Sequence, residues 1–455
     1  MIDDHTPNNE PDTPTPPTEA PTKIKKLATS QLNKTPEWTP AEVRRMTEDM
    51  TIGERVAFYR TRRGMSQEVL AGLIGRTADW LRKVEHNRLA LDRLSVIRRL
   101  AYALDVSLGD LIGEPTLLAW TQESGQRTVP ALRTALMGYR QFVFPGAQAD
   151  EPIRLDGLER EIASAWEVYQ RSRYSWLARR LPLLITDALT ASAQYGVDTD
   201  EGLRAHRLLA SVYQLATGFL TKIGEADLAS LSATKGLSAA HTSGSELMIG
   251  SLYRSVAHAL LSLGEYDQAV ALTRAASDRL QSGLGAATPE YLSVYGTLQL
   301  VGVVAAARHD NRPDAMTFLA EAEQSAHRLG RDANYLWTAF GPTNVAIHRV
   351  AAAMELGDVQ VALDLGPRID TGGLPTERRV RHAIDTARAF ARRNRVDSAL
   401  DTLLDAEQQA PEQVRYHRLS RILVQELVRR PRPSSRAIEL AARMGAHRTD
   451  PSDRP

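Results

Sequence analysis

The 455-residue chain contains no cysteine, so disulfide bonds, thiolate metal ligands and cysteine nucleophiles are all excluded. It also lacks any apolar run close to the roughly 18 residues that a membrane span requires. Its start, Met1 to His5, shows no basic stretch followed by an apolar one, which argues against a secretory signal. With 43% hydrophobic residues the composition is that of a globular protein, and we expect it to be cytoplasmic and independent of membranes.

The motifs of common enzyme classes are missing as well. The chain has no phosphate-binding loop, no HExxH pair, no GxSxG elbow and no glycine-rich dinucleotide fingerprint. Its 11 histidines are scattered, and no pair has the spacing of metal ligands. The sequence therefore predicts a protein that is not an enzyme and that holds no metal or cofactor.

A strong net charge is absent too. The value of +1 argues against a protein that coats nucleic acid along its whole length. Charge is uneven, however, because residues 51–114 carry 11 basic and 8 acidic side chains. This local excess suits a small DNA-binding module. Since the chain is too long for one compact core, we expect at least two domains.

Composition divides the chain into five segments. Residues 1–45 are rich in proline, threonine and asparagine, and we predict disorder because they hold too little apolar surface to offset the entropy of ordering. Residues 50–114 have the pattern of five short helices, and residues 155–446 are helical almost throughout. Residues 115–154 are expected to form a linker and residues 447–455 a loose tail. The predicted fold class is all-α.

The region from Arg60 to Asn87 has the pattern of a helix-turn-helix. Ser66 and Thr77 are placed to cap the second and third helices. Gly75 allows the tight turn between these helices, and asparagine at position 87 tolerates a left-handed conformation. The physical product of such a segment is a short helix presented to DNA.

The third helix has an inner and an outer face. Leu81 and Val84 are predicted to point into the core of the module. The outer face then carries Thr77, Ala78, Asp79, Arg82 and Lys83. A face of this kind enters the major groove, where Arg82 and Lys83 are suited to contact guanine or phosphate.

Residues 51–113 resemble the repressor-type helix-turn-helix family, the lambda, Cro-like or Xre group. The resemblance is carried by Arg60 late in the first helix, Ser66-Gln67 opening the second and Glu85 closing the third. It implies a partly buried ion pair between Arg60 and Glu85, a phosphate contact from Gln67, and an arginine, Arg93, that reaches towards the minor groove. The candidate DNA-binding residues are therefore Ser66, Gln67, Thr77, Ala78, Asp79, Arg82, Lys83 and Arg93. Family members dimerise on two half-sites, so a homodimer on double-stranded DNA is expected.

Three residues of the third helix depart from the family pattern. Ala78 is small and apolar where the family often has a polar residue that reads bases, and it is suited to contact a thymine methyl. Asp79 is suited to accept from cytosine, but it also repels phosphate. Trp80 is unusual at its position, where it either packs against the fourth helix or a dimer partner or contacts DNA.

The C-terminal region contains a repeat. Five segments share a turn followed, at a fixed offset, by an alanine that anchors a second helix: Ala229, Ala269, Ala315, Ala362 and Ala399. Their spacings of 40, 46, 47 and 37 residues indicate stacked helical hairpins. The units at 250–276 and around Ala399 resemble tetratricopeptide repeats. We therefore predict an α-solenoid of such hairpins, which would also serve as the dimer platform.

The pairing of the two regions resembles actinobacterial regulators and is similar to peptide-sensing regulators. In that group a re-imported peptide binds the concave face of the repeats and shifts the DNA-binding heads. The candidate ligand-binding residues are Asn344, Asn334, Tyr335 and His348, because a carboxamide can donate to and accept from a peptide backbone. Thr343 is placed to cap a new helix after Gly341-Pro342. The alternative for the ligand site is that Asn344 caps this helix and that His348 is an ordinary interior or surface histidine.

Two further groups have alternative interpretations. Trp166, Tyr169, Tyr174 and Trp176 are predicted to form the packing cap of the solenoid, or else a ligand or dimer surface. The arginine-dense segment from Arg378 to Arg395 is predicted to be a solvated face with ion pairs, with contact to an acidic peptide or DNA as the alternative.

Two functions remain open from the sequence. The first is a sequence-specific transcriptional regulator whose repeats dimerise and sense a peptide or protein signal. The second is an interaction or scaffold protein whose repeats dock a protein partner, with DNA binding only positioning that complex.

Overall fold

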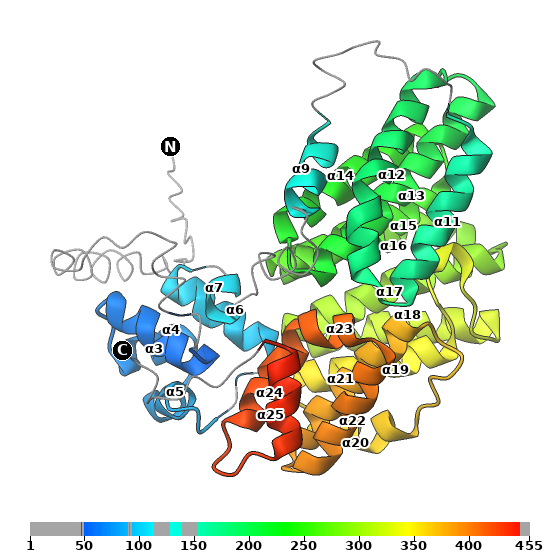
Figure 1. Cartoon of the computed structure of the whole chain (residues 1–455). Helices are drawn as coiled ribbons and strands as arrows, with labels where there is room; N and C mark the ends of the chain where they lie inside the picture. The colour runs from blue at the N-terminus through cyan, green and yellow to red at the C-terminus, as the bar shows by residue number, and fades with distance from the viewer. Residues whose placement is uncertain are drawn as a thin grey trace, which may run out of the picture.

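A computed structural model describes residues 47, 50–89, 91, 93–106, 108–112, 128–138 and 153–445, and this part of the chain forms helices without a β-strand (Figure 1). An N-terminal helix-turn-helix module is followed by a solenoid of helical hairpins, which confirms the predicted fold class. The predicted disordered segment 1–45 and the predicted tail 447–455 lie outside the described residues.

The N-terminal module has five helices: α3 (Ile52–Arg62), α4 (Gln67–Leu73), α5 (Ala78–Glu85), α6 (Leu94–Leu104) and α7 (Leu108–Ile112). Ser66 caps α4 and Thr77 caps α5, each by accepting from a backbone N–H three residues on, as the sequence predicts. Gly75 and Asn87 take positive φ values of 67° and 55° at the two turns. Leucines of four helices meet in the core, fully buried at positions 70, 81, 100 and 111.

The crossing of α3 and α5 depends on Gly53. A Cβ at this position would lie 2.2 Å from the Val84 carbonyl oxygen and 3.0 Å from Asn87 Oδ1. Backbone cannot move aside cheaply, so we expect Gly53→Ala to destabilise the module by about 1–3 kcal/mol. Hydrogen exchange of the amides in α3 and α5 measures the change.

The matched control is Gly72→Ala on the exposed face of α4. No atom lies within 4 Å of the added Cβ there, and alanine is the better helix former. This variant is expected to leave exchange unchanged or slow it. Faster exchange in both variants would show that the close approach at Gly53 does not control stability.

The C-terminal region consists of paired helices. They are α11 (Leu155–Gln170) with α12 (Tyr174–Gln194), α13 (Asp200–Lys222) with α14 (Ala226–Thr242), α15 (Glu246–Leu263) with α16 (Tyr266–Gln281), α17 (Pro289–Arg308) with α18 (Arg312–Leu329), α19 (Pro342–Leu356) with α20 (Val359–Leu365), and α21 (Thr376–Arg392) with α22 (Val396–Gln409). The chain ends with α23 (Pro411–Tyr416), α24 (Arg418–Val428) and α25 (Ser435–Arg443). The 3-10 segments η1 (Ser282–Leu284), η2 (Tyr335–Trp337) and η3 (Gly366–Arg368) lie in the connections.

The five predicted repeat turns have the same geometry. Each has a left-handed residue five positions before the anchor alanine: Gly224, Gly264, Asp310, Gly357 and Asn394. In each, the next N–H donates to a carbonyl five residues back at 2.8–2.9 Å, which closes the end of the first helix. All five anchor alanines are fully buried on the second helix, where a small side chain lets the two helices approach closely. The predicted hairpin repeat is confirmed at all five places.

The predicted linker contains a helix. Residues Thr128–Met137 form α9, and its Leu132 and Leu136 are fully buried in the same hydrophobic core as α12 and α13. Residues 128–138 are therefore part of the folded solenoid. This helix differs from the predicted linker; it is short and lies between segments rich in proline, glycine and polar residues, so its sequence pattern is weak.

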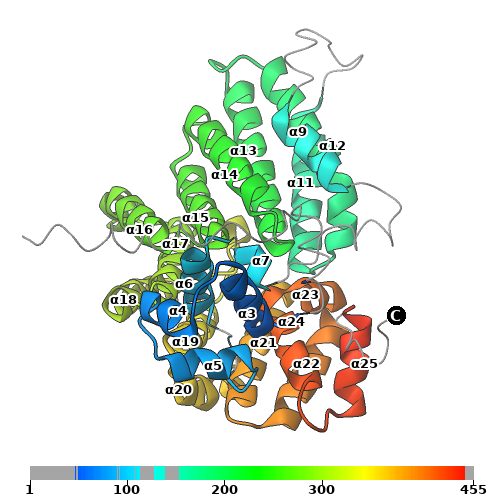
Figure 2. The ribbon, with the colours of Figure 1, turned by 90° about the vertical axis from the view of Figure 1, so that its left-hand side faces the viewer.

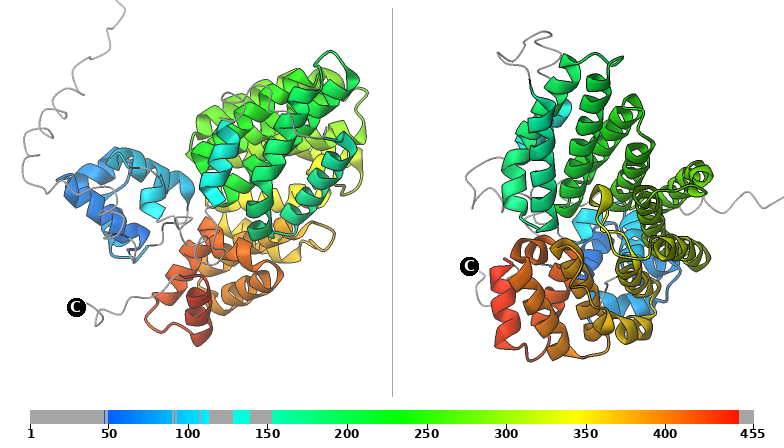
Figure 3. Two further views of the ribbon diagram at one scale, coloured as in Figure 1. Left: turned by 45° about the horizontal axis from the view of Figure 1, so that its top comes forward. Right: turned by 90° about the vertical axis from the view of Figure 1, so that its right-hand side faces the viewer.

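The solenoid curves far enough for its first hairpin to touch its last helices. The turn between α11 and α12 meets α23, where Ser172 Oγ donates to Gln413 Oε1 at 2.6 Å and the Ser175 N–H donates to Glu412 Oε2 at 2.7 Å. Figure 3 shows this curvature from two further directions. The inner surface of the helices is consequently partly closed off from the outside.

Loop 330–341 ties α18 and α19 to the first hairpin. The Trp337 ring stacks on the Trp166 ring, with centroids 6.0 Å apart and planes 5° apart. Trp166, Tyr169 and Tyr174 make successive ring contacts at 5.6 and 6.2 Å, in agreement with the predicted packing cap. Trp176 does not join them: it is 40% exposed, because it lies on the outer side of α12.

Within the described part of the chain, one helix, α17, is long and apolar enough to cross a membrane, but 83% of its apolar stretch is buried inside the protein. Helices packed against α17 on several sides account for its apolar sequence, so it is the central core helix of the solenoid.

Candidate DNA interface and interior cavity

The outer face of α5 is the candidate DNA interface. Leu81 and Val84 are buried in the core, which fixes the rotation of α5 about its axis. Arg82 and Lys83 are more than half exposed on the opposite side. The exposed or half-buried outer residues are those that the sequence analysis selected: Thr77, Ala78, Asp79, Arg82 and Lys83.

Asp79 pairs with both basic residues of this face. Lys83 Nζ lies 2.7 Å from one carboxylate oxygen, and Arg82 pairs with the other. The hydrogen bond from Lys83, with the nearby charges of Lys83 and Arg82, holds the pKa of Asp79 below its usual value. Asp79 therefore stays ionised near neutral pH, and a DNA phosphate or base has to compete with it for these cations.

A buried ion pair joins α3 to α5. Arg60 Nε lies 2.6 Å from Glu85 Oε1 and Arg60 Nη2 lies 3.0 Å from Glu85 Oε2, so the guanidinium grips the carboxylate with two bonds. Arg60 Nη1 also donates to the Met65 carbonyl at 2.7 Å. Gln67 Nε2 donates to Glu85 Oε2 at 2.7 Å. Gln67, proposed for a phosphate contact, thus uses one of its two amide hydrogens inside the module.

The other two residues singled out near α4 and α5 have local partners. Ser66 Oγ accepts from the Val69 N–H at 3.3 Å as the cap of α4. Trp80 is half-buried against the module core, with the Arg76 guanidinium 5.6 Å from its ring centre. The structure therefore shows intramolecular packing for Trp80.

Arg93 is held by the solenoid. Its Nε donates to the Glu355 carbonyl at 2.7 Å and its Nη2 pairs with Asp310 Oδ1 at 3.1 Å. The physical reason for these contacts is that Arg93, just before α6, faces the negative turn and helix end of two hairpins. A minor-groove contact would require Arg93 to leave these partners, and it stays a prediction.

Arg93 belongs to a row of arginines that docks the module on the solenoid. Arg98 Nη2 lies 3.7 Å from Asp267 Oδ1, and Arg98 Cζ lies 4.8 Å from the centre of the Tyr266 ring. Arg99 Nη2 lies 3.7 Å from Asp310 Oδ2. Three successive hairpin turns thus meet residues 93–99. Figure 2 shows the module lying over α19, α21 and α24, and its core residues are continuous with those of α21–α25.

Comparison with known families bears on this module. Residues 51–112 match the family model of a helix-turn-helix domain. This match shows the class of the module, and the rest of the chain lies outside it. No curated protein matches the chain.

A solved structure of a Rap protein complexed with Competence and Sporulation Factor is similar over 80% of this chain and 99% of its own. The TM-score is 0.40 and the sequence identity is 14%.

The four candidate ligand-binding residues lie around loop 330–341 and the start of α19, where Asn334 and Asn344 both bond the backbone of Ala339, but they do not share one cavity. Asn334 exchanges hydrogen bonds of 2.8 and 3.0 Å with Gln170 in the loop that ties α19 to α11. The Tyr335 hydroxyl accepts from Arg331 in the same loop. Asn344 is fully buried, and its Nδ2 donates to the Ala339 carbonyl at 2.8 Å. Of the four residues, His348 is the one that lines the interior cavity.

The start of α19 also differs from the expectation. The helix begins at Pro342, and the backbone N–H of Thr343 donates to Asp332 Oδ1 at 3.0 Å. Asp332 supplies the cap from across the loop, so the prediction that Thr343 caps this helix is wrong. A distant carboxylate replaces a local hydroxyl because loop 330–341 folds back against α19.

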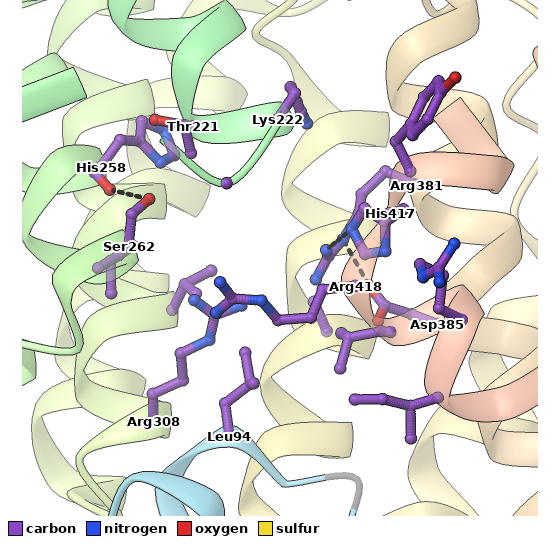
Figure 4. Close-up of a pocket in the computed structure, with 18 of the residues that line it drawn as sticks. Leu94, Thr221, Lys222, His258, Ser262, Arg308, Arg381, Asp385, His417 and Arg418 are labelled. Carbon is purple, nitrogen blue, oxygen red and sulfur yellow. Dashed lines mark hydrogen bonds and ion pairs between the residues drawn. The ribbon is translucent and has the colours of Figure 1, made fainter. Parts of the chain in front are cut away.

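The inner side of the solenoid holds a cavity of about 210 Å³ (Figure 4). Helices α13, α15, α17, α19, α21 and α24 contribute to its wall, and Leu94 and Ile112 of the DNA-binding module close one side. Its charged lining is strongly one-sided. Six basic residues face one acid, Asp385: Lys222, Arg308, Arg378, Arg381, Arg418 and Arg421.

Acids behind the wall compensate for some of this charge. Glu377 pairs with Lys222 and lies 3.1 Å from Arg378 Nη1, while Glu355 lies 3.8 Å from Arg308 Nε. Burial raises the pKa of Glu377, but Arg378 and Lys222 outweigh it and hold that pKa at about 2. Three of the lining cations, Lys222, Arg308 and Arg378, therefore have an acidic partner behind the wall.

Four histidines line the same cavity: His258, His348, His382 and His417. Burial lowers the pKa of His348 to about 4, helped by the charge of Arg378. Burial, with neighbouring arginines, holds the pKa of His258 and of His417 well below the usual value. These imidazoles are therefore neutral at pH 7.

Part of the arginine-dense segment lies in the interior of the solenoid. Arg378 and Arg381 line the cavity, and Arg388 is 2% exposed between Asp385 and Glu355. This part of α21 is interior, so the predicted solvated face is wrong for these three residues. Residues 378, 381, 385 and 388 are three or four positions apart, which places them on one face of the helix. The local sequence does not show which part of the protein that face contacts.

Proposed function

We propose that the protein is a sequence-specific DNA-binding regulator of transcription whose helical solenoid controls the helix-turn-helix module. The observation that supports this most is the structure of the module. Arg82 and Lys83 are exposed on the outer face of α5, and residues 51–112 match a helix-turn-helix family model. An exposed basic helix N-terminally capped in this way suits entry into the major groove.

The docking of the module supports a regulatory role for the solenoid. Residues 93–99 bind three hairpin turns, so a change in the spacing of those hairpins alters how the module is held. We propose that the solenoid also dimerises the protein, because one module of this size binds DNA weakly and two half-sites require two modules. A peptide or protein signal is the sequence-based hypothesis, and only His348 of its candidate residues faces the cavity.

The competing function is that of a scaffold whose repeats dock a folded protein. Its support is the solenoid, an architecture whose extended surfaces suit protein partners. It differs in the role of DNA binding, which would only position the complex with the protein partner, so that replacing the basic residues of α5 would leave the binding of the partner itself intact.

Genome-wide occupancy of the tagged protein, with and without Arg82→Ala/Lys83→Ala, tests the proposed function. We expect a few sharp sites sharing an inverted repeat, and affinity for them about ten to a hundredfold weaker in the variant, since two base or phosphate contacts are lost. Arg62→Ala/Arg76→Ala, which removes two arginines of the module outside the α5 face, is the matched control. Sites that persist in the α5 variant, or no sites at all, would favour the scaffold.

A further inference from the structure

A buried arginine of α15 has no partner. Only 8% of Arg254 is exposed, and its Nε is buried without a hydrogen-bond partner. Within the described part of the chain, its guanidinium group donates no hydrogen bond and makes no ion pair. Burial lowers the pKa of Arg254 to about 10, which leaves it charged at pH 7. An unpaired charge in the interior costs far more free energy than a buried neutral group.

The neighbouring charges do not compensate Arg254. Arg378 repels it, and this repulsion outweighs the attraction of Glu377. Glu377 is already engaged, because one of its oxygens pairs with Lys222 and the other lies 3.1 Å from Arg378 Nη1. Protein interiors normally pair such an arginine with an acid. One further negative charge beside Arg254 would therefore stabilise this part of the solenoid.

A second donor without a partner lies beside Arg254. The Tyr169 hydroxyl makes no hydrogen bond among the described residues, although it is close enough to affect the charge of Arg254. It lies against α13, where a Cβ on Gly218 would come within 3.1 Å of Tyr169 Oη. Burial raises the pKa of this hydroxyl, which therefore keeps its proton at pH 7 and can donate it to an acceptor. Two donors from separate helices, α11 and α15, thus lie close together.

These donors adjoin the interior cavity. His258, one turn after Arg254 on α15, lines the cavity, and so does Lys222, one turn after Gly218 on α13 (Figure 4). Arg378, which acts on Arg254, lines the cavity as well. The apolar part of the wall includes Ile223, Leu261, Val304 and Ile347. A molecule bound here would therefore meet charged donors at one end and apolar side chains beyond them.

We propose that Arg254 and Tyr169 bind the carboxylate of a small organic acid whose apolar part occupies the adjoining cavity. A planar guanidinium group matches a carboxylate with two parallel hydrogen bonds, and the Tyr169 hydroxyl can donate a third. A single negative charge suits the site, because a second one would meet the Glu377 carboxylate behind Arg378. The volume of about 210 Å³ is below the roughly 300–1,000 Å³ of sites for drug-sized ligands, which favours a compact acid over an extended peptide.

Calorimetry and thermal unfolding of the full chain test the site, with benzoate as the probe and benzamide as its neutral counterpart at constant ionic strength. We expect saturable binding of benzoate and at least tenfold weaker binding of benzamide, because the amide lacks the charge. Inorganic phosphate should also bind at least tenfold more weakly than benzoate, since it has no apolar part and its second charge is repelled by Glu377.

Two variants test the donors. Arg254→Met should weaken benzoate binding at least tenfold. Without the probe, the same variant should unfold at a higher temperature than the native chain, because it replaces an unpaired buried charge by an apolar side chain of similar length. Tyr169→Phe removes one hydroxyl and keeps the aromatic ring, and it should weaken benzoate binding about three- to tenfold.

The matched control is Arg274→Met, which removes an arginine from an exposed ion pair with Asp314. It should bind benzoate as the native chain does and should not gain stability. The proposal would be overturned if benzoate did not bind, if benzamide or phosphate bound as tightly, or if Arg274→Met lost as much affinity as Arg254→Met. A lower unfolding temperature of Arg254→Met without the probe, or unchanged affinity in Tyr169→Phe, would also contradict it.

This binding does not depend on the proposed function. A chain that binds benzoate as expected but has no specific DNA sites would refute the proposed function and leave the acid site standing. Specific DNA sites without benzoate binding would do the reverse.

Discussion

Arg60→Ala is expected to destabilise the DNA-binding module by about 3–5 kcal/mol, because it leaves the Glu85 carboxylate buried without its counter-charge. Only 3% of the Glu85 side chain is exposed, and Gln67 would be its one remaining hydrogen-bond donor among those the structure shows. A loss of this size is comparable to the whole stability of a small domain. Hydrogen exchange of α3–α6 within the full chain measures it, because exchange reports each helix by its own amides.

Arg63→Ala is the matched control for this prediction. Arg63 pairs with Asp105 at 2.7 Å, but 84% of the Asp105 side chain is exposed. A pair in water contributes about 0–1 kcal/mol, so exchange should change little. Arg60→Lys should fall in between, because an ammonium keeps the charge but not the two-bond grip. Equal effects of Arg60→Ala and Arg63→Ala would show that burial of Glu85 is not what makes the pair matter.

Local features of the solenoid and the module were predictable from sequence. A left-handed turn residue followed five positions later by an anchor alanine predicts a hairpin at five places, and all five hairpins form. The same holds for Ser66 and Thr77, whose capping needs only their own backbone neighbours. Each of these patterns is satisfied within a few residues, so one sequence is enough to recognise it.

Other residues have surroundings that depend on contacts between distant segments. Arg93 binds Glu355 and Asp310, more than two hundred residues further along the chain. Arg381 faces the interior because the solenoid closes by contact between the α11–α12 turn and α23. Helical spacing shows which residues share one face of a helix. Which other helix packs against that face depends on the curvature of the whole solenoid, and the spacing does not reveal it. The cavity, the most informative site of the solenoid, was therefore invisible in the sequence.

Acid is expected to unfold the solenoid well before it titrates ordinary carboxylates. The unfolded chain protonates His348 near its usual pKa of about 6.5, whereas the folded chain holds that pKa at about 4. Below pH 6.5 the unfolded state therefore binds more protons, and stability falls with pH until about pH 4. His348 alone accounts for up to about 3 kcal/mol, and the lowered pKa values of His258 and His417 act in the same direction.

Glu377 extends the loss to lower pH. Its pKa of about 2 in the folded chain lies below the usual 4.5, so the stability it contributes is present above pH 4.5 and is lost as the pH falls towards 2. Urea unfolding of the native chain and of His348→Gln at pH 7, 5.5 and 4.5 separates the two effects, because the difference between the two chains isolates the contribution of His348 and most of the Glu377 contribution is lost below this range. The variant should lose less stability between pH 7 and 4.5 than the native chain, whereas His327→Gln, on the exposed side of α18, should lose as much. An unchanged pH dependence in His348→Gln would mean that the imidazole is protonated inside the folded cavity, which then carries still more positive charge at pH 5 than at pH 7.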